Sequence, residues 1–217
     1  ITDTSLECSE FKCATGKYCK IAGVDVWIQR LSYVGELGWE IFISKSDAIT
    51  VYKAIKNNGR EFNLCDVGLH AVNSLRLEKG YRHWGHDIAA EDNLFEAGLS
   101  FTAKPDGIDF IGKDAFLKQT TQTPKRKLVQ FKLNDPDPML YHNEPIIMNG
   151  EINGYITSGM YGHSLGCAVG MGYVNCENLT EEKLKQINFE IEIATERYNA
   201  EASLVSLYDS NGSRMKL

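Results

Sequence analysis

The chain has 217 residues, of which 43% are hydrophobic and 24% are charged, and its formal net charge is −6. These values are typical of a globular protein and exclude disordered and fibrous classes. Because nucleic-acid binding requires a basic surface, the acidic balance predicts no nucleic-acid partner. The sequence contains no apolar run of about 18 residues, so we expect no membrane partner either.

The first residues contain no Met, no basic leader and no apolar signal segment, which indicates a fragment or a processed piece of a longer protein. No two of the six cysteines have the two-residue separation typical of zinc and redox motifs. We expect free intracellular thiols, with a disulfide or metal role for the cysteines at 8, 13 and 19 as the alternative.

The first predicted element is a strand at residues 24–33, where apolar and polar side chains alternate. Gly35 and Gly38 interrupt this pattern, and extended character resumes at residues 39–43. The two segments together predict a β-hairpin with Glu36 at its tip.

Two helices are expected next. Ser46 and Asp47 are suitable N-caps for the first helix, and Gly59 supplies a left-handed stop. The second helix covers residues 68–79, with apolar side chains at core spacing and Gly80 as its stop.

The middle of the chain predicts a short strand at residues 99–103 and a short helix at residues 112–119. The polar stretch 120–127 includes a proline and is typical of a domain boundary. We therefore expect two domains, residues 1–122 and residues 123–217.

Beyond this boundary the pattern changes to six short strands separated by turns, one of which, Asn149-Gly150, is a strong hairpin signal. Residues 180–185 predict a single helical turn. Short antiparallel strands of this kind favour a compact barrel or sandwich, which makes the fold class α+β. The six predicted strands are residues 127–133, 145–148, 151–158, 168–174, 189–195 and 198–207.

No P-loop, dinucleotide-binding glycine motif, serine-hydrolase elbow or metalloprotease helix is present, so those classes lose support. Glu36 lies between two glycines and near Tyr33 and Trp39, where a carboxylate could accept paired hydrogen bonds from a flat heterocycle. A solvated turn is the alternative. Arg76, near the end of its helix, could either satisfy terminal carbonyls or clamp an anionic group.

The order and spacing of several segments resemble the aminomethyltransferase (glycine-cleavage T-protein) family over essentially the whole chain. Residues 30–40 (RLSYVGELGWE) are similar to the folate-site hairpin of that family, and residues 74–80 (SLRLEKG) are similar to the helix end that follows it. Further similar segments are 85–88 (GHDI), 95–99 (FEAGL), 110–115 (FIGKDA), 157–159 (TSG) and 170–174 (GMGYV). The segments 80–84 (GYRHW) and 96–101 (EAGLSF) are most similar to members of the sarcosine dehydrogenase type.

The resemblance implies part of an aminomethyltransferase-like folate-binding domain followed by an antiparallel β-barrel domain, with tetrahydrofolate as the cofactor. In members fused to sarcosine and dimethylglycine dehydrogenases, it implies flavin-linked oxidation of an N-methyl amine, whose carbon passes to tetrahydrofolate. By the same resemblance, Glu36 would hold the pterin edge, and Arg76 would face the glutamyl carboxylate or brace the pocket. Tyr33 and Phe101 would line the pterin slot. Glu36 and Arg76 should then converge on one cleft.

The resemblance places the catalytic carboxylate and the FAD domain in a missing amino-terminal half of the same enzyme, so no catalytic residue is assigned to this chain. We expect the isolated chain neither to oxidise amines nor to transfer carbon, and to bind folate weakly. The expected compartment is the cytoplasm or the mitochondrial matrix.

Three alternatives stay open. One is a non-catalytic regulatory relative, such as the regulatory subunit of pyruvate dehydrogenase phosphatase, because a fold need not retain its chemistry. Another is a stand-alone glycine-cleavage aminomethyltransferase. The weakest is a metal-binding module built on His83, His86 and nearby cysteines, although no third ligand is evident and we expect no metal.

Overall fold

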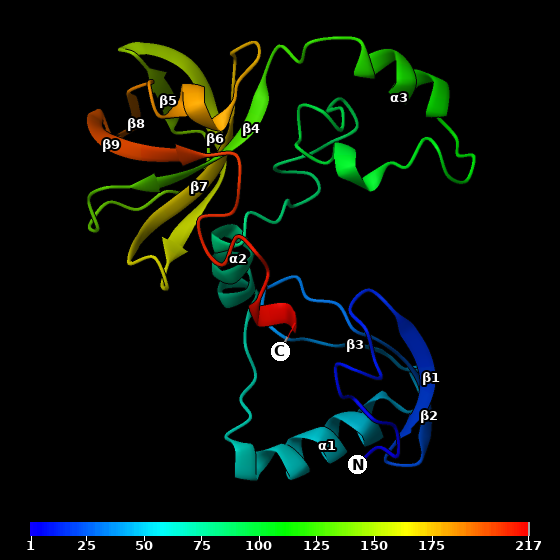
Figure 1. Cartoon of the computed structure of the whole chain (residues 1–217). Coiled ribbons are helices and arrows are strands. Elements are labelled where there is room, and N and C mark those ends of the chain that lie inside the picture. Colours follow the sequence, from blue (N-terminus) through cyan, green and yellow to red (C-terminus); the bar gives the residue numbers. More distant parts are fainter. Residues whose placement is uncertain (217) are drawn as a thin grey trace. The chain divides into compact units, whose positions relative to one another are not determined.

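The structure is a computed structural model that describes residues 1–216, and it divides into two compact units (Figure 1). The first unit contains Ile1–Val72 and residues 211–216, and the second contains Asn73–Ser210. Within residues 1–216, no helix is both long enough and apolar enough to cross a bilayer.

The first unit is built on a three-stranded antiparallel sheet in the order β1-β2-β3. The strands are β1 (Gly16–Ile21), β2 (Val24–Gln29) and β3 (Glu40–Phe42), followed by helix α1 (Ala48–Gly59). Ile21 and Val26 of the sheet are buried with Val51 of the helix in one apolar cluster. The alternating burial in β2 matches the period of two that predicted this strand.

The connection between β2 and β3 is longer than the sequence predicted. The two strands pair antiparallel, from Trp27 opposite Phe42 to Gln29 opposite Glu40, which confirms the predicted hairpin, but residues 30–39 form a long loop between them. Gly35 in this loop takes a left-handed conformation, with φ of 77°, as a glycine can without strain. Strand β1, which pairs with the other edge of β2, was not predicted.

The prediction that Gly59 ends α1 in a left-handed conformation is wrong. Gly59 has φ of −76°, and the chain continues into the 3-10 helix η1 (Arg60–Phe62). The left-handed residue is Asn63, whose amide donates to the carbonyl of Arg60. An Asn side chain tolerates this conformation, so the stop lies four residues after the predicted glycine.

Helix α2 (Leu69–Glu78) agrees closely with the predicted residues 68–79, and Gly80 after it has φ of 68°, as a helix stop requires. The last six residues of α2 belong to the second unit. Their packing against the barrel positions the segment that follows.

The second unit contains a closed six-stranded antiparallel barrel in the order β4-β7-β6-β5-β8-β9, which confirms the predicted barrel (Figure 1). Asn149 and Gly150, both with positive φ, join β5 to β6 as predicted. The helical turn α4 (Glu181–Leu184), capped by Thr180, also lies where it was expected. The strands are β4 (Lys127–Leu133), β5 (Pro145–Met148), β6 (Glu151–Gly162), β7 (Cys167–Val174), β8 (Phe189–Ile193) and β9 (Glu196–Ser203).

Both faces of the barrel wall are buried where α2 lies against it. Val129, Phe131 and Leu133 of β4 alternate into the main apolar core. Leu128 faces the other way and packs with Leu77 of α2. Accordingly, every residue of β7 is buried.

The segment between α2 and the barrel is mostly irregular. It contains the 3-10 helix η2 (Ser100–Thr102) and helix α3 (Lys113–Thr120), and the latter confirms the predicted helix at residues 112–119. The predicted strand at residues 99–103 is wrong, because Thr102 and Ala103 bond back to the carbonyls of Leu99 and Ser100. This local hydrogen bonding satisfies the backbone without a neighbouring strand. A last 3-10 helix, η3 (Arg214–Lys216), ends the described chain.

The compact units divide after Val72, whereas the sequence predicted a domain boundary after residue 122. The residues between these two points pack with the barrel. The domain ranges 1–122 and 123–217 stay a prediction.

Strand packing in the barrel leaves no room for a side chain at Gly154, where a Cβ atom would lie 2.0 Å from the carbonyl oxygen of Tyr173. We expect Gly154→Ala to lower the free energy of unfolding by about 1–3 kcal/mol, the usual cost of overpacking. Urea denaturation measures this change. The exposed Glu151→Ala in the same strand is the control and should change it by less than about 0.5 kcal/mol. Equal costs for the two variants would contradict this strand packing.

Candidate functional site

The loop at residues 30–39 presents the first candidate site residues. The Glu36 carboxylate is partly exposed, with 34% of its side chain accessible, and forms an ion pair with Arg214 of the same unit. The Nε of Arg214 lies 3.0 Å from one carboxylate oxygen and 3.4 Å from the other. Tyr33, three residues earlier, is 41% exposed. Glu36 is therefore held by a cation but remains accessible to solvent.

Arg30 anchors the base of this loop. It is 3% exposed and donates to the carbonyl of Phe11 at 2.8 Å and to the carbonyl of Met215 at 3.0 Å. A small hollow beside it is lined by residues that include Ser32, Glu36 and Met215. The Ser32 hydroxyl is buried there and has no hydrogen-bond partner among the described residues. A buried hydroxyl and a carboxylate thus lie beside one gap between packed side chains, which is too small to hold a water molecule.

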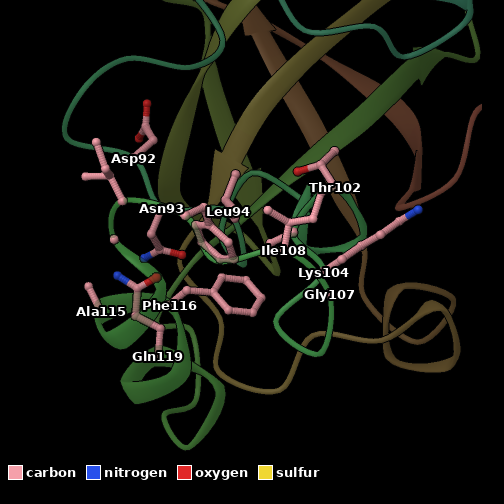
Figure 2. A pocket seen from close by; sticks show the side chains of 14 residues that line it. Asp92, Asn93, Leu94, Thr102, Lys104, Gly107, Ile108, Ala115, Phe116 and Gln119 are labelled. Carbon is pink, nitrogen blue, oxygen red and sulfur yellow. The ribbon is translucent and has the colours of Figure 1, made fainter. Parts of the chain in front are cut away.

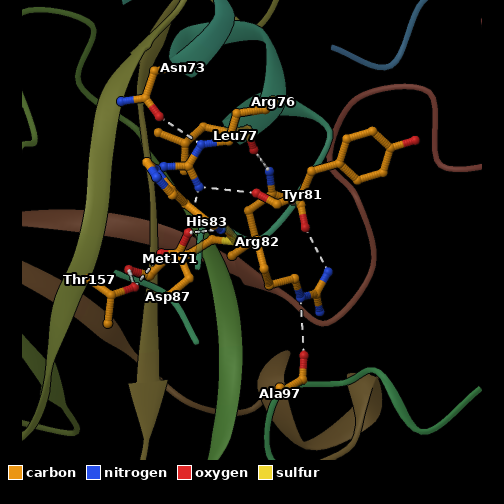
Figure 3. Close-up of polar contacts among 12 residues, drawn as sticks. Asn73, Arg76, Leu77, Tyr81, Arg82, His83, Asp87, Ala97, Thr157 and Met171 are labelled. Atoms are coloured by element: carbon orange, nitrogen blue, oxygen red, sulfur yellow. Dashed lines mark hydrogen bonds and ion pairs between the residues drawn. The ribbon is translucent and has the colours of Figure 1, made fainter. Parts of the chain in front are cut away.

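The second candidate, Arg76, lies at the centre of a buried polar network in the other unit (Figure 3). Its Nη1 is 2.5 Å from the Asp87 carboxylate, and the two side chains are 1% and 0% exposed. The same nitrogen donates to the carbonyl of Tyr81 at 3.0 Å, and Nε donates to the side chain of Asn73 at 2.7 Å. The guanidinium is therefore committed to protein acceptors.

Asp87 accepts from three elements at once. One carboxylate oxygen accepts from the backbone N–H of His83 at 2.9 Å and from Arg76, and the other accepts from the Thr157 hydroxyl at 2.6 Å. The Tyr173 hydroxyl donates to the Asp87 carbonyl at 3.0 Å. This aspartate ties the loop after α2 to strands β6 and β7.

The end of α2 is fixed to the barrel by further polar contacts. Glu78 is fully buried and accepts from the backbone N–H groups of Ser164 and Leu165 at 2.7 and 3.0 Å. Gln130 of β4 donates to the carbonyls of Leu77 and Glu78. Lys79 pairs with Asp209, with 5% and 10% of these side chains exposed. Arg76 is thus one of the buried polar residues that fix the end of α2 to the barrel. We call this set the frame; its members are Arg76, Glu78, Lys79, Asp87 and Gln130.

Titratable groups near this frame have shifted pKa values. Burial lowers the pKa of His83, and the nearby positive charge of Arg76 adds to that effect, while Asp87 opposes it. Burial also raises the pKa of Tyr173 well above its usual value, and Asp92 contributes in the same direction. The guanidinium of Arg126 lies 4.4 Å from the centre of the Tyr173 ring and pairs with Asp92 and Glu96.

A cavity of about 770 Å³ lies in the second unit between η2 and α3 (Figure 2). In the figure, Leu94, Ile108 and Phe116 lie close together, with Gln119 on one side of them and Lys104 on the other. The wall is mainly apolar, and Ile108 is 89% exposed. None of the four predicted site residues lines it.

The structure does not bring the four predicted site residues together within one unit. Tyr33 and Glu36 lie in the first unit, and Arg76 and Phe101 lie in the second, where Phe101 is 75% exposed. Their convergence on one cleft stays a prediction. Among the described residues, no group of three or more His, Cys, Asp or Glu side chains could hold a metal ion.

Three residues beside the predicted site were not singled out from the sequence. Asp87 is visible only as part of the GHDI segment, where nothing signals that it is fully buried with Arg76. Arg214 lies 178 residues from its partner Glu36, so no local pattern connects them. Ser32 looks like an ordinary loop hydroxyl, and only its buried, unpartnered oxygen distinguishes it.

Comparison with family models gives two matches. The model described as the GCVT N-terminal domain matches residues 1–107, and the glycine cleavage T-protein C-terminal barrel domain matches residues 126–209. The second match covers the strands of the closed barrel.

Individual relatives agree with these matches. The 4-methylaminobutanoate oxidase (formaldehyde-forming) of Paenarthrobacter nicotinovorans is 40% identical over 93% of this chain and 24% of its own length. The mitochondrial sarcosine dehydrogenase of Homo sapiens is 34% identical over 100% of this chain and 24% of its own length. The crystal structure of glycine cleavage system aminomethyltransferase T from Bartonella henselae superposes with a TM-score of 0.79 at 25% identity, covering 94% of this chain and 55% of that chain. This chain thus spans about a quarter of the length of the two oxidative enzymes.

The Arg76–Asp87 pair generates a stability prediction. We expect Arg76→Met to lower the free energy of unfolding of the second unit by about 3–5 kcal/mol, because it leaves the Asp87 charge buried without its partner. Arg197→Met is the control, since the Arg197–Glu192 pair lies at the surface and should cost less than about 1 kcal/mol. Denaturant unfolding followed by circular dichroism measures both. A similar loss in the two variants would show that Arg76 does not anchor the frame.

Proposed function

Because this chain belongs to the aminomethyltransferase (glycine-cleavage T-protein) family, as the sequence resemblance predicted, we propose that it is the carboxy-terminal part of a folate-dependent one-carbon transfer module. The whole protein would pass a carbon from an N-methyl amine to tetrahydrofolate, as a sarcosine or dimethylglycine dehydrogenase-like enzyme. The relatives whose names point to this chemistry support the proposal.

The observation that carries the proposal is the setting of Glu36. Its carboxylate lies on a loop held by the buried Arg30 and is partly open to solvent. A carboxylate in this setting can accept two parallel hydrogen bonds from the amino-substituted edge of a pterin, as it does from a guanidinium. Tyr33 would then pack on the flat face of the ring.

Arg76 has a supporting role in this proposal. Because its guanidinium is buried and paired with Asp87, it fits the bracing role better than direct contact with the folate glutamate. Phe101 has a largely exposed ring that would line the pterin slot. Both assignments rest on the family resemblance and on the local geometry of each side chain.

Catalysis would depend on residues outside this chain. The chain spans about a quarter of the dehydrogenase and oxidase relatives, so FAD, the oxidation of the amine and the catalytic carboxylate belong, in this proposal, to the remaining length. The chain alone would neither oxidise amines nor transfer carbon. A cytoplasmic or mitochondrial matrix location fits the bacterial and mitochondrial relatives.

A stand-alone glycine-cleavage aminomethyltransferase is the second candidate, favoured by the superposition on the Bartonella henselae enzyme. The two candidates use the same folate site and differ in the carbon donor. Assays of the longer protein with sarcosine, dimethylglycine and an aminomethyl donor would distinguish them.

The folate proposal predicts the behaviour of Glu36→Gln. Replacing one carboxylate oxygen with an amide donor removes half of the paired acceptor, so we expect tetrahydrofolate affinity to fall about tenfold or more. NMR titration of the chain measures this weak binding, and calorimetry measures it in a longer protein that includes the preceding residues.

Glu61→Gln is the matched control, because Glu61 is exposed in η1, outside the segment that resembles the folate-site hairpin, and the variant should bind tetrahydrofolate as the wild type does. Equal binding by the wild type and Glu36→Gln would rule out Glu36 as the pterin acceptor. Micromolar binding by the 217-residue chain would instead contradict the expectation that the chain alone binds weakly.

A further inference from the structure

The sheet of the first unit has two faces of different character. One face packs against α1, and its side chains belong to the apolar cluster described above. The other face carries one aromatic side chain from each strand, since Tyr18 pairs with Trp27 and Trp27 pairs with Phe42. Val26 and Ile41, which precede Trp27 and Phe42, belong to the cluster, so the aromatic side chains point away from α1. We call these three residues the aromatic row.

The aromatic row is largely accessible, and its central ring is held in place. Tyr18 is 79% exposed and Phe42 is 53% exposed, while Trp27 is half-buried. The rings of Tyr18 and Trp27 meet edge to face, with 4.8 Å between their centroids. A Cβ atom at Gly16 would lie 2.5 Å from the Trp27 ring, so the indole lies close over the backbone of β1. These contacts orient Trp27 but leave most of Tyr18 in water.

The surroundings of the aromatic row are polar. Lys20 and Asp25 form an ion pair at 2.7 Å on one side of it, and Gln29 and Glu40 lie opposite each other on the other side. Single exposed rings are common on protein surfaces, but a contiguous apolar patch with a polar rim is typical of an interaction site. Aromatic residues are also enriched at the centres of interfaces. The aromatic row therefore has the composition of a docking surface.

The first residues of the chain lie beside this sheet. The Ile1 carbonyl accepts from the backbone N–H of Ala22 at 2.8 Å, and Thr2 forms an antiparallel bridge with Ile21. Ile21 is three residues after Tyr18 in β1, and a strand rises about 3.3 Å per residue, so about 10 Å separates Ile21 from the aromatic row. About four residues of extended chain span that distance.

We propose that the aromatic row is a docking surface within a longer protein, covered by an apolar face of the part of the same polypeptide that precedes Ile1. The oxidase and dehydrogenase relatives, of whose length this chain spans 24%, have most of their residues outside the matching part. Covalent linkage keeps such a part at high effective concentration, which favours it over a separate molecule. The inference rests on the longer polypeptide of the proposed function, but it does not require folate binding.

The size of the aromatic row disfavours a second copy of the chain as the occupant. An aromatic side chain buries about 150–250 Å², so three partly covered rings offer roughly 400 Å². A stable complex of separate molecules buries about 800 Å² on each partner. Interfaces between domains of one chain bury about 600–1,500 Å² in total, so they form with as little as about 300 Å² on each side. The aromatic row is large enough for a linked domain.

Hydroxyl-radical footprinting with mass spectrometry tests this surface, because the oxidation rate of a ring follows its accessibility to solvent. The rates at Tyr18 and Phe42 are compared between the 217-residue chain and a longer protein that includes the preceding residues. Tyr52 is the internal reference, since it is 53% exposed on α1, which packs on the other face of the sheet. We expect the rates at Tyr18 and Phe42 to fall several-fold in the longer protein, and the rate at Tyr52 to change less.

Two matched variants of the longer protein test whether the aromatic row holds the preceding part in place. Tyr18→Gln removes one ring from the row, and Tyr52→Gln makes the same change on α1. We expect Tyr18→Gln to raise the rate of proteolytic cleavage in the residues before Ile1 several-fold, because fewer contacts then restrain them. Tyr52→Gln should be cleaved at the wild-type rate. Circular dichroism of both variants verifies that the fold is retained.

Unchanged oxidation of Tyr18 and Phe42 in the longer protein would overturn the proposal, as would equal protection of Tyr52 or a wild-type cleavage rate for Tyr18→Gln. Protection that appears in the 217-residue chain alone as its concentration rises would identify a second copy as the occupant and overturn it too. None of these results bears on folate binding. Conversely, tetrahydrofolate binding that Glu36→Gln leaves unchanged would overturn the pterin site and leave a protected aromatic row standing.

Discussion

The guanidinium of Arg76 and the carboxylate of Asp87 form an ion pair with 1% and 0% of the two side chains exposed. An ion pair without water is stable only when further hydrogen bonds satisfy both groups, and here Asn73, Tyr81, His83 and Thr157 supply them. Because these partners come from α2, the following loop and strand β6, the requirement to satisfy one buried charge fixes three segments together.

The chain contains a second arginine–carboxylate pair, which is accessible to solvent instead of buried. Nε of Arg214 lies 3.0 Å from the Glu36 carboxylate, and because both side chains are accessible, water screens their attraction. The buried pair is costly to break, whereas the exposed pair contributes little to stability. In our proposal, the buried Arg76 supports the fold, and the accessible carboxylate of Glu36 contacts the ligand.

The sequence predicted the fold more completely than the site. The six barrel strands and the helices at α2, α3 and α4 follow from alternation, periodicity and turn residues, which are local properties. Strand β1 was missed because its pairing with β2 stabilises it. The end of α1 was misplaced because the left-handed residue is Asn63 and not Gly59. Glu36 was predicted from its position between two glycines, but its partner Arg214 lies 178 residues away and no local pattern connects them. The burial of Arg76 also depends on Thr157 and Tyr173 from distant strands, which only the folded barrel brings to Asp87.

We propose that a pterin binds at the loop of Glu36. Mapping the amide chemical-shift changes that 6-methyltetrahydropterin causes in the isotopically labelled chain is the direct test. We expect the largest changes at residues 30–39, which include Glu36. Changes concentrated instead around the cavity between η2 and α3, at Leu94, Ile108 and Phe116, would contradict it.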